Sequence, residues 1–207
     1  MRIHEQSSDG PQPPRRVVSN ISMSLDGRIN GRGGDFDMGW IVPHAVTEVA
    51  REHLTRMTKD ATTALLGRKN YEGFGSYWPK VADDENAEPR DRTFAQWLGA
   101  VEKVVFSTTA PQLTWTNSRL SNDPVQEVRR LRGEPGGDIV VLSSSSVIRT
   151  LLAASEVDRL VIQLCPEIVG GGARLFADDA PQTSWFLSGQ SVGATGATYL
   201  TYERRAP

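Results

Sequence analysis

Three short segments place small polar residues where predicted strands end. Residues 67–70 read Gly-Arg-Lys-Asn, residues 107–109 read Ser-Thr-Thr, and residues 143–146 are four serines. Each segment follows a short apolar run. The first turn of a helix leaves backbone N–H groups unpaired and carries partial positive charge, so such junctions suit a phosphate. The three segments together predict an anion-binding edge of an α/β sheet.

Arg68 and Lys69 are the cations of this set. A guanidinium presents a planar fork that matches the oxygens of a phosphate. Taken singly, each feature has an ordinary reading, because serine and threonine cap helices without any ligand and surface cations face water. Their recurrence at successive strand ends predicts a phosphate-rich nucleotide. The chain lacks both GxGxxG after its first strand and the P-loop GxxxxGK[ST], so neither standard fingerprint applies.

The apolar pattern predicts the elements that position these segments. Strands are expected at residues 17–25, 61–66, 103–107, 138–142, 159–165, about 184–192 and about 196–204. Helical spacing predicts a helix that starts at Pro43 and buries Val46, then helices at 70–77, 124–131 and 147–152, with a helical turn at 94–98 and a charged surface stretch at 80–93.

Strands that alternate with helices give parallel pairs, whereas the last two strands, joined by a glycine turn, predict an antiparallel hairpin. The predicted fold class is therefore α/β, with a mixed, mostly parallel sheet flanked by helices. A single domain is expected over residues 17–205, preceded by a disordered tail at 1–16 that is rich in Pro, Gly, Ser and charges.

Composition excludes several classes of protein. The formal net charge of −2 over 207 residues gives no reason to expect nucleic-acid or membrane-surface partners. No apolar run approaches the roughly 18 residues that span a bilayer, and the start of the chain lacks the apolar core of a signal peptide, so a cytoplasmic location is expected. Cys165 is the single cysteine, which excludes an internal disulfide and predicts a core residue. No metal site is expected.

The motifs together resemble the dihydrofolate reductase-like superfamily and, within it, the riboflavin-biosynthesis reductase (RibD C-terminal) domain. The matching stretches in chain order are SMSLDGRI, GW followed by Pro43, LLGRKNYEGF, VVFSTT and CPEIVGGGARLF. They cover nearly all of residues 17–205, and the GRK turn and the PEIVGGG loop are the most specific. The resemblance implies the fold of that superfamily and NADPH as the cofactor.

In similar proteins, the Gly-Arg-Lys turn holds the adenosine half of NADPH. Gly67, Arg68 and Lys69 would do so here, with both cations facing the 2′-phosphate, and Asn70 would donate to the pyrophosphate from a position where many relatives have threonine. The other implied contacts are Ser107 and Thr108 on the adenosine side, Ser143, Ser144, Ser145 and Ser146 at the pyrophosphate, and the backbone near Ser22 and Ile29 at the nicotinamide. Several relatives have Gly-Gly where this chain has serines. Because a Cβ disfavours positive φ, either the turn has another shape here or cofactor affinity is reduced.

At the substrate end, the resemblance makes Asp26 and Trp40 candidate catalytic residues. Asp26 lies on the loop over the nicotinamide and could manage the proton, although Asp-Gly is also a common turn dipeptide. Trp40 would line the floor of the cleft, or serve as a core residue. Folate reduction requires a carboxylate two residues after Pro43, where this chain has Ala45. Neither Glu48, one turn further on, nor His44 is expected to replace it.

Riboflavin-type relatives reduce a phosphorylated ribosylamino-pyrimidine, 5-amino-6-(5-phosphoribosylamino)uracil. Such a substrate needs a second phosphate site, for which Arg28, Arg32 and Arg174 are candidates. The zinc deaminase half of bifunctional relatives needs a Cys-x-x-Cys, which a chain with one cysteine cannot supply.

The leading hypothesis is an NADPH-dependent reductase of a small heterocyclic or carbonyl substrate, with that pyrimidine as one candidate. The cofactor performs hydride transfer, so the protein needs to supply only orientation and electrostatics. The alternatives are a nucleotide-binding protein without catalysis and a weak dihydrofolate reductase. Because relatives are commonly dimers, a homodimer with sheet-edge or late-strand contacts is expected.

Overall fold

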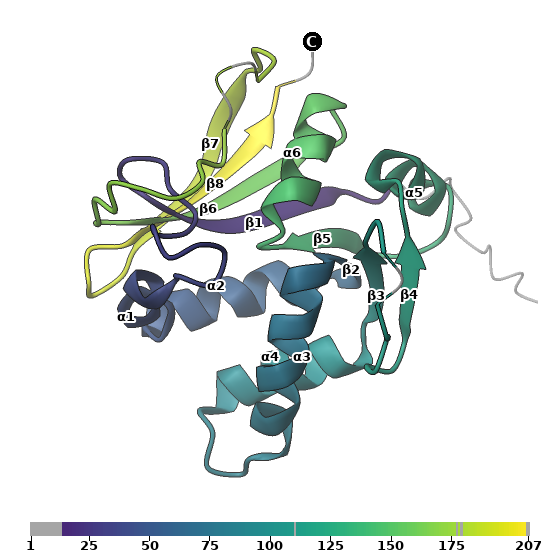
Figure 1. Cartoon of the computed structure of the whole chain (residues 1–207), viewed down its shortest axis with the longest axis horizontal. Coiled ribbons are helices and arrows are strands. Elements are labelled where there is room, and N and C mark those ends of the chain that lie inside the picture. Colours follow the sequence, from purple (N-terminus) through teal and green to yellow (C-terminus); the bar gives the residue numbers. More distant parts are fainter. Residues whose placement is uncertain (1–13, 110, 177, 179, 206–207) are drawn as a thin grey trace, which may run out of the picture.

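One eight-stranded sheet organises the computed structural model, which describes residues 14–109, 111–176, 178 and 180–205 (Figure 1). The strands lie in the order β4-β3-β2-β5-β1-β6-β8-β7. Their bounds are β1 (Val17–Ser24), β2 (Ala61–Gly67), β3 (Glu102–Phe106), β4 (Ser118–Ser121), β5 (Asp138–Leu142), β6 (Arg159–Cys165), β7 (Trp185–Val192) and β8 (Thr198–Arg204). Pairs from β4 to β6 are parallel, whereas β8 is antiparallel to both β6 and β7. The predicted fold class and the terminal hairpin are confirmed.

Helices cover both faces of this sheet. They are η1 (Gly39–Ile41), α1 (Val42–Ala45), α2 (Glu48–Thr58), α3 (Arg68–Asp83), α4 (Pro89–Ala100), α5 (Pro124–Arg132) and α6 (Ser145–Ala153). Within the described residues, no helix combines the length and the apolar character that crossing a membrane requires.

Alternate side chains of the central strands build two cores, because successive residues of a strand point to opposite faces. Leu65 and Val141 belong to the core that α5 and α6 cover, and Leu66 and Val140 belong to the core under α2, α3 and α4. Cys165 is fully buried, as predicted, and burial raises the pKa of its thiol to about 11. The result is a three-layer domain with the sheet in the middle (Figure 1).

The helix expected to run on from Pro43 is divided in two. α1 ends at Ala45, and α2 starts afresh with Thr47 as its N-cap, whose hydroxyl accepts the Ala50 N–H at 3.3 Å. Val46 lies between the two helices and is 52% exposed. The prediction that Val46 lies on a buried helical face is therefore wrong, because a new cap restarts the helix after it.

The stretch at 80–93, expected to be an irregular charged surface, is largely helical. α3 continues past Pro79, and Glu88 caps the start of α4 with its carboxylate. Trp78 packs edge-on against Phe94, with ring centroids 4.7 Å apart. Packing between α3 and α4 thus keeps the chain helical beyond a residue that normally ends a helix.

Residues 1–13 of the expected tail lie outside the described residues. Arg15 and Arg16 lie inside them and contact the sheet. The Arg15 guanidinium donates to Thr63 Oγ1 at 2.7 Å, and the Arg16 guanidinium pairs with Asp138 at 2.9 Å. The folded part therefore includes residues before Val17, and the division into a tail and one domain stays a prediction.

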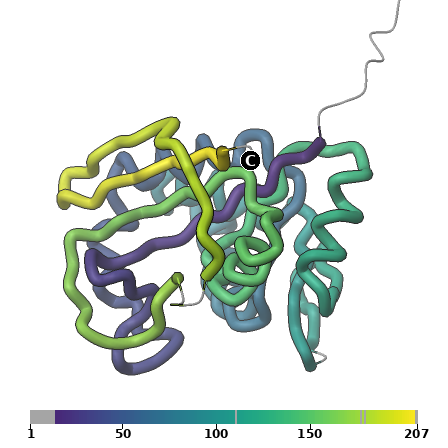
Figure 2. Tube along the Cα trace, turned by 90° about the horizontal axis from the view of Figure 1, so that it is seen from above, coloured from purple at the N-terminus to yellow at the C-terminus, as the bar shows by residue number. Residues whose placement is uncertain are grey.

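Two loops form one end of the molecule, where Figure 2 shows them side by side. The first loop comprises residues 25–38, between β1 and η1, and the glycine loop comprises residues 166–176, after β6. The Ile29 N–H donates to the Ala173 carbonyl at 3.0 Å, and the Ala173 N–H donates to Asn30 Oδ1 at 2.6 Å. A Cβ on Gly172 would lie 2.1 Å from the Asn30 carbonyl oxygen. Glycine at 172 is therefore required by the close approach of the two loops.

Lys103, on β3, is fully buried. Its ammonium donates to the carbonyls of Leu98, Gly99 and Val101 at 2.9, 3.0 and 2.7 Å. The last carbonyls of a helix have no partner within the helix. Lys103 therefore satisfies the end of α4 and fixes that helix to the sheet.

We expect Lys103→Met to lower the free energy of unfolding by about 3 kcal/mol, because it leaves buried carbonyls without a donor. Urea denaturation followed by circular dichroism measures the change. Lys80→Met, at an exposed position near the end of α3, is the control and should change stability by less than about 0.5 kcal/mol. Equal effects of the two substitutions would contradict the role of Lys103.

Candidate functional site

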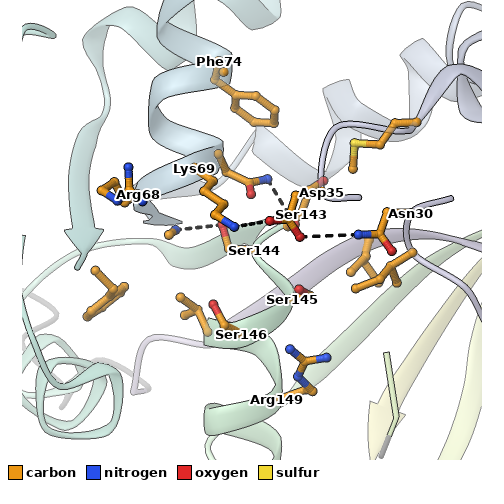
Figure 3. A pocket seen from close by; sticks show the side chains of 18 of the residues that line it. Asn30, Asp35, Arg68, Lys69, Phe74, Ser143, Ser144, Ser145, Ser146 and Arg149 are labelled. Atoms are coloured by element: carbon orange, nitrogen blue, oxygen red, sulfur yellow. Dashed lines mark hydrogen bonds and ion pairs between the residues drawn. The ribbon is translucent and has the colours of Figure 1, made fainter. Parts of the chain in front are cut away.

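A cleft of about 790 Å³ runs along the carboxyl ends of β1, β2, β3 and β5. All twelve residues expected to bind the cofactor line it, and Figure 3 shows several of them around the same space. They are Ser22, Ile29, Gly67, Arg68, Lys69, Asn70, Ser107, Thr108, Ser143, Ser144, Ser145 and Ser146. The fold thus brings together segments that are far apart in the sequence.

Two helices that begin at this cleft, α3 and α6, start differently from α2 and α4 and from α5, which also begins at the cleft. α2, α4 and α5 have side-chain N-caps in Thr47, Glu88 and Asp123, and each carries an acid in its first turn. α3 and α6 have neither a side-chain cap bond nor an acid there. Their first N–H groups and their partial positive charge are therefore left for an anion in the cleft.

The serine run keeps a sharp turn in spite of its side chains. Ser143 has φ of 49°, in the left-handed region that favours glycine. The Ser144 hydroxyl accepts the Gly67 N–H at 2.8 Å and donates to the Leu142 carbonyl at 2.9 Å. This chain thus adopts the left-handed conformation at Ser143 in spite of the Cβ, and the choice between an altered turn and reduced cofactor affinity stays a prediction.

Both cations of the first junction line the cleft, and both are engaged in ion pairs. Arg68 pairs with Glu72 at 3.0 Å, one turn along α3, and Lys69 pairs with Asp35 of the first loop. All four side chains are at least 41% exposed. Exposed pairs contribute at most about 1 kcal/mol, so a phosphate can replace the carboxylates.

Asn70 has a partner within the protein. Its amide Nδ2 donates to the Ser143 carbonyl at 3.1 Å. One of its two N–H donors is therefore used to hold the serine turn against α3, and the other remains for a ligand.

The junction after β3 differs from the expected helix start, because a loop follows the strand. Ser107 accepts the Thr109 N–H at 3.1 Å through its hydroxyl. Ser107 and Thr108 still line the cleft, beside Asn122 and Pro124 at the start of α5. Ser107 and Thr108 therefore offer a ligand their hydroxyl and backbone groups, but no helix starts directly after this strand.

Asp26 does not line the cleft. Its carboxylate accepts the Ser24 hydroxyl at 2.6 Å and the N–H groups of Val169 and Gly170 at 3.1 and 2.9 Å. These donors, led by Ser24, hold the pKa of Asp26 well below its usual range. Asp26 thus holds the glycine loop as an anion, and this geometry does not suit the expected handling of a proton.

Trp40 also lies outside the lining, although its neighbour Ile41 belongs to it. The indole Nε1 of Trp40 is buried and has no hydrogen-bond partner among the described residues. The structure therefore does not bring either expected catalytic side chain into the cleft.

The arginines considered for a second phosphate site are outside the lining as well. Arg28 donates to the Gly172 carbonyl at 2.7 Å, and Arg32 donates to the Gly170 carbonyl at 3.1 Å. Both therefore hold the glycine loop in place. The carbonyl of Arg174 accepts a hydrogen bond from Arg149 at 3.0 Å.

Several lining residues were not found from the sequence. They are Asn30, Asp35, Phe36, Phe74 and Arg149, among others. Asp35 and Asn30 lie in the first loop; Asp35 pairs with Lys69 across the cleft and accepts a hydrogen bond from the Asn30 amide at 3.5 Å (Figure 3). Arg149 stands four residues after Ser145, one helical turn further, and this spacing is a signal that could have identified it.

The lining fits a dinucleotide in one further respect. A Cβ on Gly67 would make only ordinary contacts, at 3.7–3.8 Å, with Ser144 and Ser146. Packing within the protein therefore does not require glycine at 67, and its absent side chain leaves room for a ligand against the backbone. Among the residues that the structure describes, no group of His, Cys, Asp or Glu side chains could hold a metal ion.

Comparison with known proteins agrees with this geometry. The model of the RibD C-terminal domain family matches residues 15–199. The uncharacterized protein YyaP of Bacillus subtilis is 24% identical over 188 residues, covering 91% of this chain and 94% of that protein.

Two solved structures share the fold. A pyrimidine reductase-like protein from Corynebacterium diphtheriae superposes with a TM-score of 0.63 at 15% identity, covering 93% of each chain. Dihydrofolate reductase from Enterococcus faecalis, solved in complex with NADP(H) and RAB-propyl, superposes with a TM-score of 0.59 at 17% identity, covering 92% of this chain and 97% of that one. The predicted dihydrofolate reductase-like fold is confirmed.

Ser143→Gly should raise the free energy of unfolding by about 0.5–1 kcal/mol. The left-handed conformation costs a residue with a Cβ roughly 1–2 kcal/mol, and glycine removes this cost. Part of the gain is offset because glycine raises the conformational entropy of the unfolded chain. Urea titrations would measure the difference. Ser146→Gly, in the first turn of α6 and without positive φ, is the matched control and should lower stability. A loss of stability in both variants would show that Ser143 is not strained.

Proposed function

The chain belongs to the RibD C-terminal domain family, and from this membership we propose that it is an NADPH-dependent reductase of a small heterocyclic or carbonyl substrate. The observation that carries the proposal is the uncapped start of α3 and α6 at one cleft, beside the cations Arg68 and Lys69. Two unpaired helix starts and two cations suit a ligand with several phosphates.

The residues present fit this cofactor. Arg68 and Lys69 would hold the 2′-phosphate, and the N–H groups at the start of α6, with Ser145 and Ser146, would hold the pyrophosphate. Ser22 and Ile29, further along β1 and the first loop, would border the nicotinamide. NADPH, when bound, supplies the hydride.

The titratable side chains nearest to the cleft are already hydrogen-bonded to other groups of the protein. Asp26 is held as an anion by Ser24 and the glycine loop, and it lies outside the cleft lining. His44 bonds to Thr195 Oγ1 at 2.8 Å and to Glu167 at 3.1 Å, and it also lies outside the lining. We therefore assign the proton to water that enters the open cleft.

Two other functions compete with this one. The engagement of the nearby acids favours a nucleotide-binding protein without catalysis: Asp26 lies outside the lining, and Asp35, the one acidic side chain among the described lining residues, pairs with Lys69. Such a protein would bind NADPH without any acceptor increasing the rate of its oxidation. Folate reduction is disfavoured because Ala45 lines the cleft at the position where a carboxylate is required.

A homodimer is part of the same proposal. It is supported by the edge strand β7, on which Phe186, Leu187 and Val192 are 44%, 46% and 65% exposed. Exposed apolar side chains on an edge strand often form an interface between subunits.

Arg68→Ala should weaken NADPH binding tenfold to a hundredfold and leave NADH binding within about twofold. The reason is that charge-assisted hydrogen bonds to the 2′-phosphate, worth roughly 1.5–3 kcal/mol, are lost only for the phosphorylated cofactor. Isothermal titration calorimetry measures both affinities. Lys80→Ala, on the same helix, should change neither. Equal losses for NADPH and NADH in the Arg68 variant would reject the assignment.

Asp35→Asn should strengthen NADPH binding by about twofold to fivefold. The substitution removes a carboxylate that competes with phosphate for Lys69, in an exposed pair worth roughly 0.2–1 kcal/mol. Asp83→Asn makes the same charge change at the far end of α3 and should have no effect. Weaker binding by Asp35→Asn would indicate that Lys69 does not face a phosphate.

A further inference from the structure

The cleft has a second end, which is apolar. Figure 1 places the first loop and α1 on one side of β2 and β5, and β3 and α5 on the other. The junction after β3, with Ser107 and Thr108, is on the side toward α5, and the serine run follows β5 itself. The side toward α1 is lined by Phe36, Met38, Ile41, Val42, Ala45 and Phe74.

The cations near this apolar end are committed to other groups. Arg28 and Arg32 donate to carbonyls of the glycine loop, and neither lines the cleft. Lys69 reaches this side but meets the carboxylate of Asp35. Arg149 lies with Ser145 and Ser146 on α6 (Figure 3), and one of its donors is used by the Arg174 carbonyl. Among the described residues, the cations in the lining are Arg68, Lys69 and Arg149; the proposed cofactor contacts use the first two, and none of the three lies on α1 or in the first loop.

The anions are committed as well. Asp26 binds the N–H groups of the glycine loop, and Asp37 accepts the Gly33 N–H at 2.9 Å. Neither carboxylate lines the cleft. Asp35, in the first loop, is the one carboxylate among the described lining residues, and it pairs with Lys69.

The apolar side chains at this end are left in contact with water. Phe36 is 72% exposed and Val42 is 59% exposed. Covering them with a flat apolar ring is favourable, whereas placing a phosphate monoester of charge about −1.5 to −2 among them without a partner is costly. The lining thus favours an uncharged apolar ring over a phosphorylated substrate.

We propose that the substrate of this reductase is an uncharged, planar, conjugated ring bearing a carbonyl or imine group, without a phosphate. The proposal rests on the proposed NADPH-dependent function and narrows it. The ring packs between Phe36, Val42 and Phe74. The carbonyl carbon gains the hydride of the reduced nicotinamide, which becomes the oxidised ring, and the carbonyl oxygen takes a proton from water to give an alcohol.

Two acceptors that differ by one charged group test the proposed substrate class. Isatin is a flat, uncharged heterocyclic ketone, and isatin-5-sulfonate differs from it by one anionic group. With the full chain and NADPH, we expect kcat/KM for isatin to exceed that for the sulfonate, and that for 5-amino-6-(5-phosphoribosylamino)uracil, by at least tenfold. A preference for either anionic compound overturns the proposal. Failure to reduce isatin when calorimetry shows bound NADPH also overturns it.

Substitutions at the apolar end of the cleft test where the substrate ring binds. Phe36→Ala should raise KM for isatin about tenfold and leave the NADPH dissociation constant unchanged. Val42→Arg should raise the ratio of sulfonate to isatin turnover at least fivefold, since it adds a cation at the apolar end. Tyr77→Ala removes another exposed aromatic from α3, outside the lining, and should alter none of these values. An unchanged ratio in Val42→Arg would place the ring elsewhere and reject the proposal.

The proposed NADPH-dependent function and the proposed substrate class can be rejected separately. If calorimetry detects no NADPH binding to the unmodified chain, the proposed function fails, and the substrate class fails with it. If NADPH binds and the phosphorylated pyrimidine is the better acceptor, the reductase function stands and only the substrate class is rejected.

Discussion

The hydroxyl of Ser144 joins the two strand ends on which the cleft depends. It accepts the N–H of Gly67, at the end of β2, and donates to the carbonyl of Leu142, at the end of β5. α3 and α6 begin at these two strand ends, so the same hydroxyl fixes where both uncapped helix starts lie. Because Ser144 is 2% exposed, its bonds are protected from competition by water. Together with the bond from the Asn70 amide to the Ser143 carbonyl, this link holds the serine turn against the start of α3.

The opposite wall depends on contact between the first loop and the glycine loop. Asp26, Arg28 and Arg32 bind backbone groups of the glycine loop, and Gly172 approaches the Asn30 carbonyl too closely for any side chain. Residues that look available for catalysis or phosphate binding are therefore used to shape the wall. None of the three side chains lines the cleft, so they do not add charge to its α1 end.

The sequence allowed seven of the eight described strands and twelve of the residues that line the cleft to be predicted, for a physical reason. Apolar runs and strand-end polar residues are local features, and the parallel topology brings such strand ends to one edge. Contacts between distant segments could not be predicted in this way. The helix expected at 70–77 continues past Pro79 because Trp78 packs on Phe94, and β4 was not predicted because its single large apolar residue, Leu120, is 42% exposed. The roles of Asp26 and Asp35 depend on partners in other segments, Gly170 and Lys69, which no local pattern identifies.

The arrangement of committed charges also limits which acceptors can react. Reduction of a carbonyl requires a proton as well as a hydride, and a poised acid commonly accelerates this step. Asp26 is held ionised, His44 is bonded to Thr195 and Glu167, and Ala45 has no proton to give. With water as the donor, proton transfer contributes little to lowering the barrier. An acceptor must then be electrophilic by itself, as conjugated dicarbonyl and imine rings are, so the proton supply and the apolar lining independently favour the same chemical class.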